Sequence, residues 1–90
     1  MDITWDLEKA HSNIAKHGVA FSDAEPVLFD PYGITLEDER IDHEQRFVTI
    51  GLDAMGRILV VVYTYRNENI RLISTRQATK QEKKDYETGI

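Results

Sequence analysis

Lys16 and His17 are the side chains in this sequence with the clearest chemical capacity, in the segment NIAKHGV of residues 13–19. They stand directly before Gly18, and glycine commonly ends a helix. Positive charge in a last turn is favoured by the carbonyl end of the helix. The pair therefore has two interpretations, a solvated helix end or part of a site that binds anions and moves protons.

Arginine recurs along the second half of the chain, where extended segments are predicted. Arg46 and Arg57 each begin a predicted strand, and Arg71 and Arg76 lie on the last one. A guanidinium group can donate two parallel hydrogen bonds to one phosphate. These residues indicate either a phosphate-binding sheet surface or arginine stems that simply cover an exposed sheet face.

Metal and serine chemistry fit the residues less well. Asp42, His43 and Glu44 are adjacent, so their side chains point in different directions, and no helical pair of ligands accompanies them. Ser74 has no glycine elbow and no evident histidine–carboxylate relay. The chain has no cysteine, which excludes thiolate ligands and disulfides. We expect neither a metal site nor a cofactor.

A helix over residues 7–17 should carry Lys16 and His17, with Asp6 as its N-cap and Gly18 as its C-cap. At 100° per residue the helix presents two separate stripes. The predicted buried stripe is Leu7, Ala10 and Ile14, and the predicted polar stripe is Lys9, Asn13 and Lys16.

The remaining elements predict an α+β fold. A second short helix should begin at Phe21–Ser22 with a Ser22/Glu25 capping box, and a terminal helix over 80–87 with a Thr79/Glu82 box. Strands are expected over 34–36, 46–52, 57–65 and 70–76. In the last strand, Ile70, Leu72 and Ser74 should share one face, and Arg71, Ile73 and Thr75 the other. We therefore expect N-terminal helices packed on one face of an antiparallel meander, followed by a short C-terminal helix.

Composition and charge limit the class of protein. Ninety residues that are 41% hydrophobic predict a single domain over 1–90. The net charge is −5, but residues 1–44 hold eleven acids and three bases, whereas residues 45–90 hold five acids and eight bases. A polyanion should therefore prefer the second half. The longest apolar run, Ile58 to Tyr63, is too short to cross a bilayer, and no signal peptide is evident, so we expect a cytoplasmic protein without a membrane partner.

Three segments together resemble the BrnT family of toxins from type II toxin–antitoxin systems. They are WDLEKAHSNIAKHGVAF from Trp5 to Phe21, EQRFVTIG from Glu44 to Gly51, and IRLISTRQATKQE from Ile70 to Glu82. They occur in the family's order and spacing and span nearly the whole chain. The family's last block commonly reads ISAR, whereas this chain has ISTR with Thr75.

The resemblance implies a RelE-like fold, ribonuclease activity that arrests translation, and a hetero-oligomer with a BrnA-type antitoxin. It carries over to Lys9, Asn13, Lys16 and His17 in the first block, Arg46 in the second, and Arg71, Ser74 and Arg76 in the third. The acidity of the chain is a departure, because a ribonuclease is expected to be basic. A weakly active or inactive RelE-like binding module within an antitoxin complex is the alternative.

Metal-independent RNA cleavage would need a base for the ribose 2′-hydroxyl, an acid for the 5′-oxygen, and cations around the phosphate. Histidine titrates near neutrality, so His17 is the acid–base candidate. Lys16, Arg46, Arg71 and Arg76 are the candidates for neutralising the phosphate. The expected RNA-binding residues are Lys9, Asn13, Arg57, Tyr63 and Ser74, and Tyr63 or Tyr65 could stack on a base.

Overall fold

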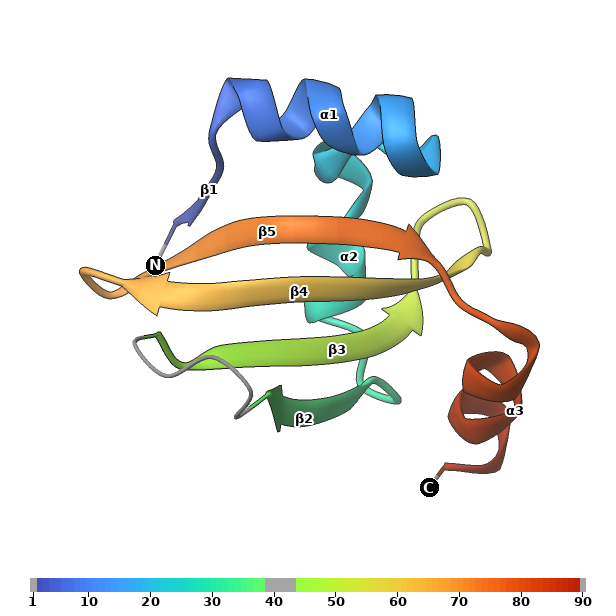
Figure 1. Ribbon diagram of the computed structural model, residues 1–90. Helices are drawn as coiled ribbons and strands as arrows, with labels where there is room; N and C mark the ends of the chain where they lie inside the picture. The colour runs from blue at the N-terminus through green and yellow to red at the C-terminus, as the bar shows by residue number, and fades with distance from the viewer. Residues whose placement is uncertain (1, 39–43, 90) are drawn as a thin grey trace.

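The computed structural model describes residues 2–38 and 44–89 (Figure 1). Within them, five strands form one sheet in the order β1-β5-β4-β3-β2. The elements in chain order are β1 (Ile3–Thr4), α1 (Leu7–His17), the 3-10 turn η1 (Phe21–Asp23), α2 (Glu25–Leu28), β2 (Ile34–Asp38), β3 (Arg46–Leu52), β4 (Ile58–Arg66), β5 (Asn69–Gln77) and α3 (Lys80–Thr88).

The strands from β2 to β5 form the expected antiparallel meander, so the α+β class is confirmed. The apolar strand β4 lies between β3 and β5, as its near-continuous hydrophobic run predicts. The short strand β1 adds a parallel pair that the sequence did not indicate, with Ile3 opposite Ile70 and Thr4 opposite Arg71. This pair brings the start of the chain beside the start of β5.

The turn η1 and helix α2 pack on one face of the sheet, and α1 adjoins them along the edge formed by β5. The main core lies under them and includes the fully buried Phe21, Val27, Leu59 and Leu72. A Cβ on Gly51 of β3 would lie 3.0 Å from the carbonyl oxygen of Val27, so glycine is what lets α2 approach the sheet this closely. These contacts fix which side of each strand faces the helices.

On the opposite side of the sheet, which we call the open face, the described residues pack over one end. There Ile50 and Val60 pack with Ala78 and with Tyr86 of α3. The hydroxyl of Tyr86 donates a 2.5 Å hydrogen bond to the Asp30 carboxylate and holds α3 in place. The predicted capping box of this helix is confirmed. No helix in the described ranges has the length and apolarity that crossing a membrane would require.

Helix α1 has the predicted bounds and caps, and Ala10 is buried as predicted, but the predicted buried stripe is wrong at Leu7 and Ile14. Leu7 and Ile14 are 71% and 49% exposed, whereas Asn13 is only 5% exposed. The reason is that α1 runs along the outer edge of β5 (Figure 1). The helix therefore buries Ala10 and Asn13 against that edge.

The second helix also differs from the prediction. A 3-10 turn over Phe21–Asp23 precedes a single α-helical turn, and Ser22 forms no capping hydrogen bond. The N-cap of α2 is Ala24, whereas Ser22 lies inside the preceding 3-10 turn, so Ser22 does not stand at a capping position. The expected Ser22/Glu25 box therefore does not form.

Candidate functional site

A bulge in β5 decides which side chains share the open face. Leu72 pairs with Tyr63, but the next paired residue is Ser74, opposite Val62, so Ile73 is an extra residue in the strand. Directly paired residues lie on the same face of a sheet. Ser74 therefore lies on the open face and Thr75 on the helix-covered face, which reverses the predicted alternation for these residues.

The bulge places three of the predicted site residues on one face. Arg71 pairs with Thr64, Ser74 with Val62, and Arg76 with Val60, and these three β4 residues all lie on the open face. Arg46 of β3 also pairs with Thr64 and joins the same row as Arg71. Bulges are frequent beside active sites because they redirect side chains in this way.

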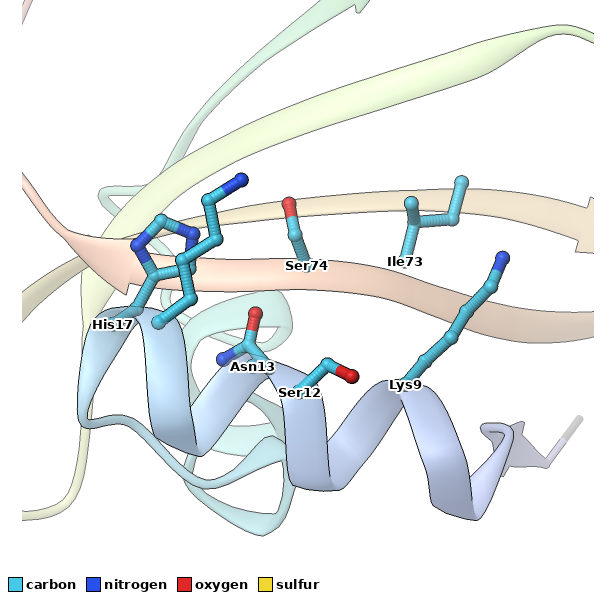
Figure 2. A pocket seen from close by; sticks show the side chains of 7 residues that line it. Lys9, Ser12, Asn13, His17, Ile73 and Ser74 are labelled. Atoms are coloured by element: carbon cyan, nitrogen blue, oxygen red, sulfur yellow. The ribbon is translucent and has the colours of Figure 1, made fainter.

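A pocket of about 250 Å³ lies where α1 meets the bulged part of β5 (Figure 2). Figure 2 shows Ser74 and Ile73 projecting from β5 to the same side, with Lys9 and His17 from α1 at opposite ends of the pocket. Two lysines and one histidine of α1 thus line the same pocket as the hydroxyl of Ser74 from β5. The lining residues are Lys9, Ser12, Asn13, Lys16, His17, Ile73 and Ser74.

The side chains of Lys16 and His17 have neither a hydrogen bond nor an ion pair within the part of the chain that the structure describes. Lys16 is exposed and His17 is half-buried. Cationic and imidazole groups without a protein partner can bind an anion at little cost, because no existing contact must break. The arrangement can hold a phosphate near a group that transfers protons.

Arg71 extends this positive surface toward the start of α1. Its guanidinium lies 4.0 Å from the Asp6 carboxylate, which caps α1 by accepting from the amides of Glu8 and Lys9. These two amides, and more weakly the charges of Arg71 and Lys9, lower the pKa of the Asp6 carboxyl. Arg71 and Lys9 therefore lie near the same carboxylate, at the end of the pocket far from His17.

The other two predicted catalytic arginines have acidic partners. Arg46 donates a 3.3 Å hydrogen bond to Glu44, which also pairs with Arg66 at 3.2 Å. Arg76 makes a two-pronged contact with Glu82 of α3, with distances of 2.7 and 3.0 Å. The Arg76 guanidinium lowers the pKa of the Glu82 carboxyl to about 2. The fork of Arg76 is therefore occupied by a carboxylate, and Arg76 does not line the pocket.

Three of the predicted RNA-binding residues occupy positions that suit structural roles. Tyr63 is 5% exposed, stacks on Phe47 and shares a 2.9 Å hydrogen bond with Thr49, so it is not open to a base. Arg57 bonds at 2.8 Å to both Asp53 and Asp23. The third is Asn13, whose amide bonds only to the backbone. Tyr65 is half exposed and remains available for stacking.

The described residues contain no group of three histidine, aspartate or glutamate side chains that could hold a metal ion. Asp42 and His43 lie outside the described residues. Glu44 is described, and it is engaged by Arg46 and Arg66. Hydrogen bonds from these arginines outweigh the effect of burial and hold the pKa of the Glu44 carboxyl below its usual value.

Ser12 and Ile73 were not singled out from the sequence although both line the pocket. Ser12 stands one turn from Lys9 and one turn from Lys16, so helical spacing could have found it. Ile73 could not be found in this way, because its position depends on the bulge.

Residues 5–82 match the family model described as the ribonuclease toxin BrnT of a type II toxin–antitoxin system. The crystal structure of the Brucella abortus ribonuclease toxin BrnT is similar, with 30% sequence identity and a TM-score of 0.72. That match covers 89% of this chain and 99% of the Brucella chain. No curated protein matches this sequence.

Proposed function

This chain belongs to the BrnT family of ribonuclease toxins, and on that premise we propose that it is an endoribonuclease with its active site between α1 and β5. The observation that supports this most strongly is the pocket in which Lys9, Lys16 and His17 meet Ser74. We further propose that it acts in the cytoplasm and cleaves RNA without a metal ion.

The proposed reaction uses the RNA's own 2′-hydroxyl as the nucleophile. Its oxygen attacks the adjacent phosphorus and the bond to the 5′-oxygen breaks, which leaves a 2′,3′-cyclic phosphate and a free 5′-hydroxyl. One proton leaves the 2′-oxygen and one joins the 5′-oxygen, so the step needs proton transfer at both ends. Negative charge grows on the phosphate oxygens between them, and fixed cations stabilise it.

The pocket residues suit these roles. His17 is the group that transfers protons, because it is the imidazole of the pocket and its side chain has no hydrogen bond or ion pair with the described residues. Lys9 and Lys16 neutralise the phosphate from the helix side. The hydroxyls of Ser12 and Ser74 can donate hydrogen bonds to the phosphate oxygens from opposite walls.

Arg71 and Arg46 are proposed to bind the RNA backbone next to the scissile phosphate. They share one row of the open face, and each makes a partly exposed ion pair. Such pairs contribute little to stability, so a phosphate can replace the carboxylate. Arg76 would bind the RNA backbone only if its ion pair with Glu82 breaks.

The proposed protein partner is an antitoxin of the BrnA type, bound as a hetero-oligomer over the open face. Leu36 of β2 is 62% exposed there, and Val48 and Val62 are half-buried beside it in the same cross-strand row. Arg46 and Arg71 form the next row. An antitoxin segment with apolar and acidic side chains would cover both rows and the RNA-binding arginines together.

Induced expression of the chain with and without its antitoxin tests this function. We expect growth arrest and loss of RNA when the chain is expressed alone, and recovery when the antitoxin is expressed with it. A His17→Ala variant at equal abundance should be harmless. Arrest by that variant would show that toxicity does not depend on the proposed active site.

A catalytically inactive binding module is the second candidate. It is favoured by the net charge of −5 and by the acidic partners that Arg46, Arg57 and Arg76 already have. Indifference of the cells to expression of the chain alone, together with tight binding to the antitoxin, would favour this module over the ribonuclease.

A further inference from the structure

Asn13 is the buried polar residue that joins the two walls of the pocket. Its side-chain nitrogen donates 2.8 Å hydrogen bonds to the carbonyl oxygens of Val19 and Thr75, and its oxygen accepts a 3.0 Å bond from the Thr75 amide. All three bonds go to the backbone, and both amide hydrogens are used. Figure 2 shows its side chain lying between α1 and β5.

The Asn13 amide takes the place of a missing strand. Strand β1 pairs with β5 only at Ile70 and Arg71, so the described chain offers no strand to the same edge of β5 at Thr75. A carboxamide has one carbonyl and an N–H, which is the pattern of a peptide group. Asn13 therefore satisfies both backbone groups of Thr75 as a neighbouring strand would.

The remaining bond fixes the end of α1. Val19 follows Gly18, which leaves the helix in a left-handed conformation with φ of 70°. Lys16 and His17 lie between Asn13 and Val19, so the bond to Val19 encloses them in one short closed segment. Ser74 directly precedes Thr75, so the other two bonds fix the strand at the position where the bulge ends.

We propose that Asn13 is a positioning residue, which sets the distance between the Lys16–His17 end of α1 and Ser74 without touching RNA. This inference rests on the proposed function, because the positioned groups are those of the proposed active site. The side chain acts through two backbone anchors, Val19 and Thr75. A displacement of about 1 Å at an active site can cost ~100-fold in rate, so loss of these anchors should be visible in turnover.

The variants Asn13→Asp and Asn13→Ala test this role. Aspartate keeps the shape but loses both N–H donors, and alanine loses all three bonds. Val27→Ala is the matched control, because Val27 is fully buried in α2 and contacts neither pocket wall through a hydrogen bond. If Asn13→Asp or Asn13→Ala does not fold, it is replaced by Asn13→Ser, which keeps a smaller donor and acceptor.

Two sets of measurements are compared at a temperature where every variant is folded. In RNA cleavage, kcat should fall at least tenfold for the Asn13 variants, with a smaller change in KM, and should stay near the wild-type value for Val27→Ala. In NMR spectra, the imidazole signals of His17 should shift in the Asn13 variants only. The Thr75 amide should exchange faster in Asn13→Ala, which loses the oxygen that accepts from this amide.

The outcomes separate the two proposals. If kcat and the His17 signals of the Asn13 variants match those of the Val27→Ala control, Asn13 is merely structural and the inference fails. If the wild-type chain does not cleave RNA, the proposed function fails, and the His17 and Thr75 signals still decide whether Asn13 positions the pocket.

Discussion

Arg71 and Arg76 lie on the same face of β5, although their odd separation would place them on opposite faces of a regular strand. The extra residue at Ile73 produces this arrangement and also turns Ser74 to the open face. Arg71 is the one near the pocket, whereas Arg76 is held by Glu82. The two arginines should therefore differ in their importance for RNA cleavage.

Replacement of Arg71 by alanine should lower the rate of RNA cleavage about 10- to 100-fold, because a cation beside the reacting phosphate is lost. Stability should change by no more than about 0.5 kcal/mol, since Arg71 is partly exposed and its ion pair is long. Cleavage assays and denaturant unfolding measure the two effects. Lys83→Ala on α3 removes the same charge from an exposed position and is the control. Equal losses of activity in both variants would indicate a general charge effect.

Replacement of His17 by glutamine should lower kcat about 100- to 10,000-fold, the range expected for loss of a general acid or base. The pH profile of kcat/KM should also change, because the proposed proton-transfer group has been removed. Lys16→Arg should retain much of the activity, since the positive charge remains. An unchanged pH profile in His17→Gln would assign proton transfer to another group.

Replacement of Thr75 by valine should raise the free energy of unfolding by about 1 kcal/mol. The Thr75 hydroxyl is buried and has no hydrogen-bond partner among the residues that the structure describes, so a methyl group of similar size removes an unsatisfied polar atom. The backbone groups that bond to Asn13 are unaffected by this change. Denaturant unfolding measures this gain in the free energy of unfolding, and the dependence of that free energy on denaturant concentration should not change. A loss of stability would mean that the hydroxyl has a favourable contact.

The Arg76–Glu82 pair should make stability depend on pH in the acidic range. The folded-state pKa of Glu82 is about 2, below its ordinary value of 4.5, so the pair stabilises the fold above about pH 5. This contribution is lost as the pH falls from about 5 toward 2. Glu82→Gln should cost on the order of 1 to 2 kcal/mol at pH 7, after allowance for the partial exposure of the pair.

Glutamine can still serve in the capping box, so this variant isolates the charge. Unfolding of the two proteins should be compared from pH 7 to pH 2, where their stabilities should converge. A difference that stays constant over this range would show that the carboxylate is not stabilised by Arg76.

Much of the fold follows from local sequence patterns. The helix ends are marked by Asp6, Gly18 and the Thr79/Glu82 box. Short polar side chains accept hydrogen bonds from the free amides at a helix start, and glycine adopts the left-handed conformation that ends a helix. The meander was predicted because alternation and turn residues act over a few positions. The parallel pairing of β1 was not predicted, since it joins residues that are distant in sequence.

The site was only partly predictable for the same reason. Helical spacing brought Lys9 and Lys16 to one side of α1, which is a local property. The bulge at Ile73 and the bonds of Asn13 to Thr75 depend on tertiary contacts. The two-residue period of a strand therefore does not predict the face of Ser74, and the 3.6-residue period of a helix does not predict the burial of Asn13. Polarity suggested that Asn13 faces solvent, but its amide is buried against an unpaired strand edge.

Cleavage of RNA by the purified chain in excess EDTA tests the central claim most directly. The chain should be freed of antitoxin and incubated with a single-stranded RNA and with DNA of the same sequence. We predict that RNA is cleaved equally with and without EDTA, that the products carry 2′,3′-cyclic phosphates, and that DNA, which lacks the nucleophile, stays intact. Cleavage that EDTA abolishes and a divalent metal restores would contradict this mechanism and direct attention to Asp42, His43 and Glu44.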